Sequence, residues 1–345
     1  MKNPITPRTA LFALCSLLST ATQAAEKLHV YIWADYIKPE LIERFQDEQD
    51  CEVVIDTFDS NESMFAKVRA GAAGYDILVP SNYMLGLLVQ KNLLRELDPK
   101  LLPNAAQVDP QVLAKLEDKT MRHGVPYAIG YGVLAYRKDR LTSPPDSWAA
   151  LEMPGVNRKA CLLNDMRETL GAALKSLGHS VNTRDATQLT AAAAVVKRWK
   201  QSVARFDNEQ YKSAIDSGEF VLVHGYSGDL FQVVAENDHV GVLLPREGLV
   251  MACDEMVIPA TAPQPALAHA FINFLLDPAV AAENMEWTGY VCPNVGGMKK
   301  VSPEFLANPA VAVPEAVRAK SEVIEDVGEA LSLYTKVWDE VKAGN

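Results

Sequence analysis

The chain has 345 residues, of which 48% are hydrophobic and 22% are charged. This composition excludes a disordered or low-complexity chain, and the length suits two lobes of ordinary domain size better than one core. The formal net charge of −11 disfavours a nucleic-acid partner, because phosphates need clustered Lys and Arg. The acidic balance is weakly consistent with a cationic ligand, although ordinary solubility charge explains it more simply.

Residues 1–25 have the features of a secretory signal peptide. Lys2 and Arg8 precede an apolar run over 9–22, and the small residues of "TQAAE" offer a cleavage site. The run is too short to span a membrane. Cys15 follows Leu14, whereas a lipoprotein cleavage site needs a small residue before its cysteine. We therefore expect a free, cleaved protein rather than a lipid-anchored one.

From residue 27 the chain alternates between strand and helix patterns. Short apolar runs such as "KLHVYIW" indicate strands, and amphipathic runs such as "KPELIERFQDEQ" indicate helices. Such alternation predicts a mostly parallel sheet with helices on both faces. The expected strands are 27–33, 51–59 and 75–81, and the expected helices are 38–49, 60–74 and 83–94.

Two long extended stretches, 124–139 and 249–259, are expected to cross between two α/β lobes. Strands at 219–229 and 239–248 belong to the second lobe, and the tail over 314–344 has a helical pattern. We expect lobe 1 to comprise 26–134 and 252–300, and lobe 2 to comprise 135–251 and 301–345. Ligands of open α/β sheets bind beyond the carboxyl ends of the strands, so the strand-end loops between the lobes are the place to search.

Patterns for catalysis are missing from the sequence. The six histidines are scattered and form no zinc motif. Ser227 in "GYSGD" misses the spacing of a serine nucleophile elbow by one residue. "GYGVLA" at 130–135 fits a dinucleotide-binding pattern only on paper, because no helix can follow it. We expect a binding protein without metal or cofactor rather than an enzyme.

Nearly every expected strand end carries an acidic side chain, an aromatic side chain or both. Singly, these residues have structural explanations: Asp35 and Asp165 could cap helices, and Tyr83 and Tyr290 could be core residues. Together, several carboxylates in one cleft would repel one another unless a cation joined them. Aromatic faces beside them suit ammonium groups. The candidate ligand-binding residues are Trp33, Asp35, Tyr36, Ser81, Tyr83, Asp165, Glu168, Tyr226, Asp229, Asp254 and Tyr290.

The chain resembles the periplasmic polyamine-binding proteins of bacterial ABC importers. The matching stretches include "LHVYIWADYIKPELIERF", "TFDSNESMFAKVRAGAAGYDILVPSNY", "FINFLLDP" and "GYVCPN", and they run over nearly the whole mature chain. The resemblance implies an α/β fold of the two-lobed venus-flytrap type, with a polyamine such as putrescine or spermidine between the lobes. It also implies an inner-membrane ABC permease as partner and a monomer as the default state.

The resemblance assigns roles to most of the candidate residues. Trp33, Asp35 and Tyr36 match an aromatic-x-acid-Tyr motif, and Ser81 and Tyr83 match pocket residues. Asp165 and Glu168 stand where spermidine binders have an acid pair, and putrescine binders use the position of Glu168. Asp229 matches an amine-binding acid of putrescine binders, and Asp254 and Tyr290 match residues that both groups share.

Four positions depart from the family pattern, so the identity of the ligand stays open. Tyr226 stands where the family has Trp, Ala252 where it has a large aromatic, Ala34 where it has Ser or Thr, and Ile324 where spermidine binders have Gln. A disulfide between Cys253 and Cys292 could replace the missing bulk at Ala252. Another cationic amine, agmatine-like or a quaternary ammonium, and a ligand-sensing subunit are the alternatives to polyamine import.

Overall fold

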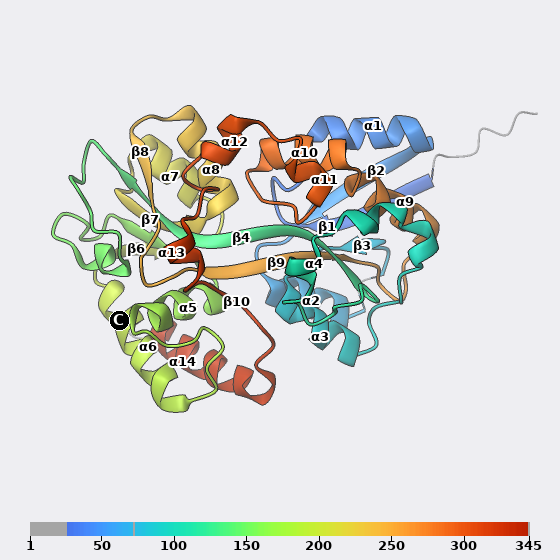
Figure 1. The fold of residues 1–345 in the computed structure, drawn as a ribbon. Helices are drawn as coiled ribbons and strands as arrows, with labels where there is room; N and C mark the ends of the chain where they lie inside the picture. The colour runs from blue at the N-terminus through green and yellow to red at the C-terminus, as the bar shows by residue number, and fades with distance from the viewer. Residues whose placement is uncertain (1–25, 72, 344–345) are drawn as a thin grey trace, which may run out of the picture.

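A computed structural model describes residues 26–71 and 73–343, and the predicted signal peptide lies outside them (Figure 1). The strands form one mixed sheet in the order β2-β1-β3-β9-β4-β7-β5-β6, with β10 beside β9 and β8 beside β4. The molecule has two halves, one with strands β1 to β3 and the other with strands β5 to β8, which lie at opposite ends of the long strands β4 and β9 (Figure 1). The predicted α/β class and the two β crossings are confirmed.

The first half of the chain alternates as predicted. Because β1 is parallel to both β2 and β3, the chain must return to the same edge of the sheet before each new strand begins. A helix makes this return both between β1 and β2 and between β2 and β3. Helix α2 begins after its N-cap residue Ser60, whose hydroxyl accepts a hydrogen bond from the backbone NH of Ser63. The elements are β1 (Glu26–Ile32), α1 (Pro39–Gln49), β2 (Cys51–Thr57), α2 (Asn61–Arg69), β3 (Ile77–Leu78) and α3 (Asn82–Gln90).

Strand β4 (Gly124–Arg137) joins the two halves of the sheet. Its first part pairs antiparallel with β9 (Val250–Val257), and its last part pairs antiparallel with β7 and β8 of the second half. Strand β9 in turn pairs with β3 of the first half. The chain therefore passes between the halves along two adjacent, hydrogen-bonded strands, which hold the strand ends of both halves near one another.

The second half contains its own parallel strands and helices. Strand β5 is parallel to both β6 and β7. The elements are β5 (Ala160–Leu162), α5 (Met166–Ser176), α6 (Ala186–Trp199), β6 (Val203–Phe206), α7 (Tyr211–Ser217), β7 (Leu222–Tyr226), α8 (Ser227–Glu236) and β8 (Val240–Leu243).

The helix predicted over the whole tail is wrong in part. Glu322 and Val323 form the short strand β10 (Glu322–Val323), because their backbone pairs in parallel with the edge of β9. A long helix begins only at Leu331. The remaining elements are α4 (Pro110–Leu113), α9 (Pro265–Leu275), α10 (Pro278–Thr288), α11 (Val295–Met298), α12 (Pro303–Ala307), α13 (Glu315–Arg318), α14 (Leu331–Ala343) and the 3-10 turns η1 (Pro99–Leu101), η2 (Pro103–Gln107), η3 (Trp148–Glu152) and η4 (Gly328–Ala330).

Each half has its own hydrophobic core. One surrounds Trp148 and Trp199, and another surrounds Phe45 and Phe271. Tyr226 is half-buried and packs against both of them.

No single helix within 26–71 and 73–343 is long and apolar enough to cross a membrane. Helices α9 and α10 satisfy the length and composition only as a pair, and the pair is bent by 75°.

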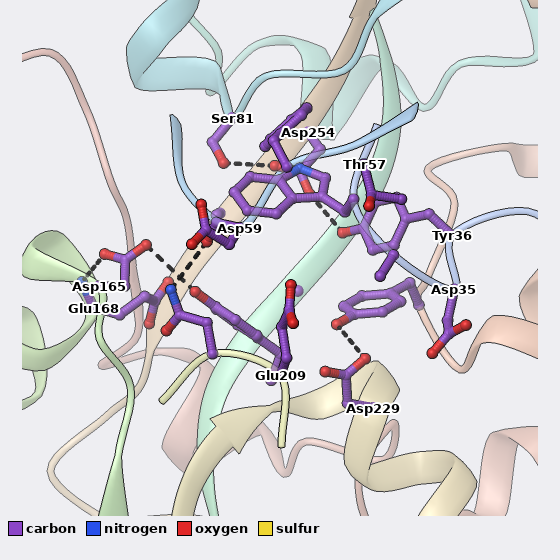
Figure 2. Close-up of a pocket in the computed structure, with 18 of the residues that line it drawn as sticks. Asp35, Tyr36, Thr57, Asp59, Ser81, Asp165, Glu168, Glu209, Asp229 and Asp254 are labelled. Atoms are coloured by element: carbon purple, nitrogen blue, oxygen red, sulfur yellow. Dashed lines mark hydrogen bonds between the residues drawn. The ribbon is translucent and has the colours of Figure 1, made fainter. Parts of the chain in front are cut away.

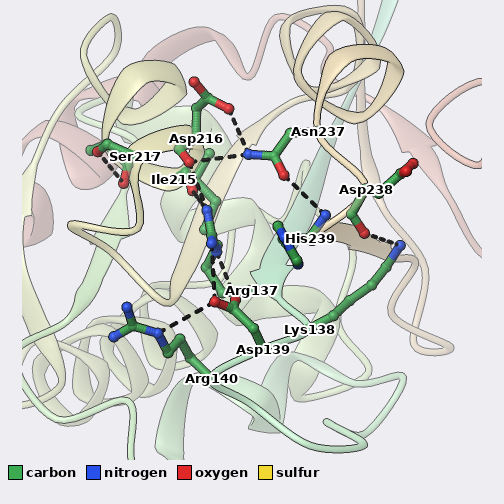
Figure 3. Close-up of polar contacts among 11 residues, drawn as sticks. Arg137, Lys138, Asp139, Arg140, Ile215, Asp216, Ser217, Asn237, Asp238 and His239 are labelled. Carbon is green, nitrogen blue, oxygen red and sulfur yellow. Dashed lines mark hydrogen bonds and ion pairs between the residues drawn. The ribbon is translucent and has the colours of Figure 1, made fainter.

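The far end of β4 is fastened by a buried arginine (Figure 3). The guanidinium of Arg137 donates from Nε and Nη2 to the carboxylate of Asp139, over 2.8 and 3.1 Å. Its Nη1 donates to the backbone carbonyl of Asp216 on α7, over 2.6 Å. The fork-shaped pairing with Asp139 orients the guanidinium. The Nη1 hydrogen bond then holds the crossing strand to helix α7, which also contributes to the site described below.

Candidate functional site

The strand ends of both halves enclose a cavity of about 360 Å³ (Figure 2). All the candidate residues predicted from the sequence line it: Trp33, Asp35, Tyr36, Ser81, Tyr83, Asp165, Glu168, Tyr226, Asp229, Asp254 and Tyr290. Asp165 and Glu168 lie on one side of the cavity and Asp35 and Asp229 on another, while Asp254 lies above and between them (Figure 2). The structure thus brings the predicted set into one place.

Asp35 reaches the cavity because the chain turns directly after β1. Its φ of 54° is left-handed, a conformation that Asp tolerates better than most residues. It does not cap α1, whose N-cap position is Lys38 with no side-chain bond. Asp165 differs, since Oδ1 does cap α5 by accepting from the backbone NH groups of Arg167 and Glu168, each over 2.9 Å. Its Oδ2 remains for the cavity and lies 3.3 Å from the Tyr226 hydroxyl.

Asp254 is held by two hydroxyl donors from the first half of the chain. The Tyr36 hydroxyl donates to Oδ2 over 2.5 Å, and the Ser81 hydroxyl donates to Oδ1 over 2.6 Å. Asn61 donates to Ser81 Oγ over 3.0 Å and so directs the serine proton toward the carboxylate. Burial raises the pKa of Asp254 to about 6, although the Ser81 and Tyr36 hydrogen bonds oppose that shift.

Glu168 is the least satisfied acid of the cavity. The residue is 3% exposed, and its Oε2, which lies beside Gly132 and the His224 ring, has no hydrogen-bond partner among residues 26–71 and 73–343. Burial raises the pKa of Glu168 well above its usual value, and the charges of Asp165 and Asp254 add to the shift. The neighbouring Arg167 guanidinium opposes the shift but donates elsewhere, to the Glu325 carbonyl over 3.0 Å and to Asn182 Oδ1 over 2.9 Å.

The Asp229 side of the cavity is more crowded with donors. The Tyr211 hydroxyl donates to Oδ2 of Asp229 over 2.5 Å, and the Tyr290 hydroxyl donates to Oδ1 over 3.2 Å. Lys212 Nζ donates to Asp35 Oδ2 over 2.8 Å and lies 3.9 Å from Asp229 Oδ1. Burial lowers the pKa of Lys212, but the charges of Asp229 and Asp35 outweigh burial, so the pKa is raised.

Aromatic rings form the walls between these acids. The rings of Tyr36 and Tyr290 are 4.6 Å apart, and those of Trp33 and Phe58 are 4.4 Å apart. The Tyr83 hydroxyl donates to Glu62 over 3.3 Å, just outside the cavity. The cavity therefore combines carboxylates on separate sides with aromatic faces, an arrangement that suits an organic cation.

Strand-end reasoning overlooked several lining residues. Phe58 and Asp59 directly follow β2, so the search of strand ends that found the other residues should have included them. Asn208 and Glu209 follow the end of β6, a strand that the sequence patterns did not predict, and Lys212 lies in the first turn of α7. The lining residues outside the predicted set are Ala34, Thr57, Phe58, Asp59, Gly130, Asn208, Glu209, Lys212, Ala252 and Ile324.

The proposed disulfide between Cys253 and Cys292 is wrong, because both cysteines are free. Successive side chains of a strand point to opposite faces, so Cys253 faces away from the cavity that Ala252 and Asp254 line. Cys253 packs against Leu116 and Ile129 instead. Cys292 belongs to a separate cluster around Met285. The space beside Ala252 is therefore not filled by sulfur.

Several known proteins are similar to this chain. Residues 40–313 match the family described as bacterial extracellular solute-binding protein. The chain is 33% identical to a putrescine/cadaverine-binding protein of Pseudomonas aeruginosa, over 96% of this chain and 98% of the relative. It is also 33% identical to the spermidine/putrescine-binding periplasmic protein of Escherichia coli, over 92% of each. The structure of the Tp0655 (TpPotD) lipoprotein of Treponema pallidum is 32% identical and superposes with a TM-score of 0.82, over 92% of this chain and 99% of that one.

Proposed function

Because the chain belongs to the bacterial extracellular solute-binding proteins, we propose that it captures a polyamine in the cavity between its halves for uptake by an ABC importer. The resemblance to periplasmic polyamine-binding proteins that the sequence predicts is confirmed. The names of these relatives support an amine ligand such as putrescine, cadaverine or spermidine. The residues of the cavity support the same ligand independently.

The buried carboxylate of Glu168 is the observation that carries this proposal. Glu168 lines the cavity and its Oε2 accepts no hydrogen bond from the described residues, so a cation that enters the cavity would stabilise a costly buried acid. Asp165 and Asp254 add negative charge nearby, and an ammonium group would satisfy all three acids at once. The rings of Tyr36 and Tyr290 would then contact the methylene chain of the ligand.

The remaining parts of the proposal follow from the family. We propose that the mature chain works in the periplasm after removal of residues 1–25, as a monomer that delivers its ligand to an inner-membrane permease. Closure of the two halves about β4 and β9 would enclose the ligand. A hydrolase centred on Ser227 is disfavoured, because this serine is 3% exposed and its Oγ accepts the backbone NH of Tyr131 over 3.2 Å.

A thermal-shift panel tests the proposal. The ligand-free protein is melted with putrescine, cadaverine, agmatine, spermidine and spermine, and with glutarate as an anionic control. A ligand that binds only the folded state raises the melting temperature as its concentration rises. We expect a concentration-dependent rise with at least one amine and none with glutarate. A flat response to every amine would remove the proposed function.

A further inference from the structure

Lys212 is the one cationic side chain among the described residues that line the cavity. It projects from the first turn of α7, and its Nζ contacts acids from both halves of the chain: Asp35 at 2.8 Å and Asp229 at 3.9 Å. Gln232 Oε1 lies 3.4 Å from the same nitrogen. This side chain thus presents an ammonium group to the two acids that an amine ligand would otherwise contact on that side.

The two sides of the cavity therefore differ in what they can accept. At Asp229, Lys212 supplies a cation 3.9 Å from Oδ1. At Glu168, no cationic side chain of the described residues lines the cavity, and the buried carboxylate has an oxygen without a hydrogen-bond partner. A ligand ammonium can fill the Glu168 side directly. On the Asp229 side it would meet Lys212, and two like charges that compete for the same carboxylates repel each other.

Small residues form the cavity surface beside Tyr290. Gly130 and Ala252 face each other across the β4–β9 pair, and both line the cavity. A Cβ atom on Gly130 would come within 3.2 Å of the Tyr290 ring, whose hydroxyl donates to Asp229. Small side chains here leave room for an uncharged group next to Tyr290.

We propose that Lys212 is a specificity-determining residue that fills the second amine position, so that the cavity selects amines with one cationic end and one neutral end. A diamine that carries an acyl group on one nitrogen has this chemistry. Its free ammonium would bind at Glu168, Asp165 and Asp254, and its capped end would lie beside Tyr290 and Lys212. This inference rests on the proposed function, because it concerns the ligand class of the same cavity.

Titration calorimetry at pH 7 with putrescine and N-acetylputrescine tests the inference. These ligands share one carbon chain and differ in the number of cationic ends. The variants are Lys212→Met, which removes the charge and keeps the length, and Lys212→Arg, which keeps the charge. Lys197→Met changes an exposed lysine of α6 and serves as the matched control.

We expect the wild-type protein to bind N-acetylputrescine more tightly than putrescine. Lys212→Met should move the ratio of the two dissociation constants at least tenfold toward putrescine, while Lys212→Arg and Lys197→Met keep the wild-type ratio. If both ligands bind and Lys212→Met leaves the ratio unchanged, the inference is wrong and the proposed function stands. If neither ligand nor any other amine binds, both fall together. Should Lys212→Met not fold, Lys212→Gln provides the same comparison under the same criterion.

Discussion

The hydroxyl of Tyr36 lies 2.5 Å from Oδ2 of Asp254, although 218 residues separate them in the sequence. This hydrogen bond ties the turn after β1 to the crossing strand β9. Ser81 completes the contact from the loop before α3, over 2.6 Å to Oδ1. Asp254 is thus held in place before any ligand arrives, which reduces the ordering that a ligand must impose on the site.

Replacement of Asp254 by Asn should weaken amine binding strongly. A hydrogen bond to a charged group contributes roughly 1.5–3 kcal/mol, so the affinity should fall about tenfold to a hundredfold. Titration calorimetry with putrescine measures the change. Asp339→Asn, at an exposed position of α14, is the control and should bind as the wild type does. Equal affinities of the two variants would show that Asp254 does not bind the ligand.

The stability of the ligand-free protein should fall as pH rises, in part because of Asp254. Its folded pKa of about 6 lies above the ordinary value of 3.8, so the folded state favours the protonated form. The contribution of this group is complete below pH 4 and is lost as pH rises toward 7. The loss amounts to about 3 kcal/mol, from about 1.4 kcal/mol for each unit of pKa difference. Urea unfolding of the wild type and Asp254→Asn should show a steeper pH dependence in the wild type, and parallel curves would contradict this.

Replacement of Glu168 by Gln should change stability and binding in opposite directions. A neutral amide removes the charge of a buried carboxylate that lacks a full set of partners, so the ligand-free protein should melt at a higher temperature. The same change removes an acceptor for the ligand ammonium, so the thermal shift with putrescine should shrink. Glu340→Gln at an exposed site of α14 should alter neither. A variant that melts lower and keeps its putrescine shift would show that Glu168 is structural.

Amine affinity should rise with pH between 5 and 8. An ammonium group binds the ionised carboxylate, and burial raises the pKa values of Asp254 and Glu168 in the free protein. A single acid with a pKa of about 6 makes binding about tenfold weaker at pH 5 than at pH 7. Calorimetry in two buffers of different ionisation enthalpy should also detect proton release on binding. A pH-independent affinity would mean that both acids are already ionised without ligand.

Strand-end chemistry predicted much of this site because the ends of the strands determine its position. Asp35 and Asp254 follow or occupy strands with clear apolar patterns, so their placement in one cleft followed from the topology alone. Lys212 could not be predicted in this way, because its partner Asp35 lies in the other half of the chain. That contact depends on how closely the two halves approach, and no local pattern encodes this distance.

The remaining errors have local causes. The tail was expected to be helical throughout, but pairing with the edge of β9 places Glu322 and Val323 in a strand. The proposed disulfide assumed that Cys253, next to Asp254, and Cys292, two residues after Tyr290, both flank the cavity. Alternation along β9 places neighbouring side chains on opposite faces of the sheet, which separates Cys253 from the cavity.

Titration calorimetry of the mature chain with putrescine and its mono-acetylated form at pH 7 tests the central claim most directly. The account predicts saturable one-to-one binding of at least one of the two ligands, weakened in Glu168→Gln and unchanged in Glu340→Gln. Saturable binding that is equally tight in Glu168→Gln would place the ligand elsewhere. No heat of binding with either ligand, or with the longer amines, would contradict the account.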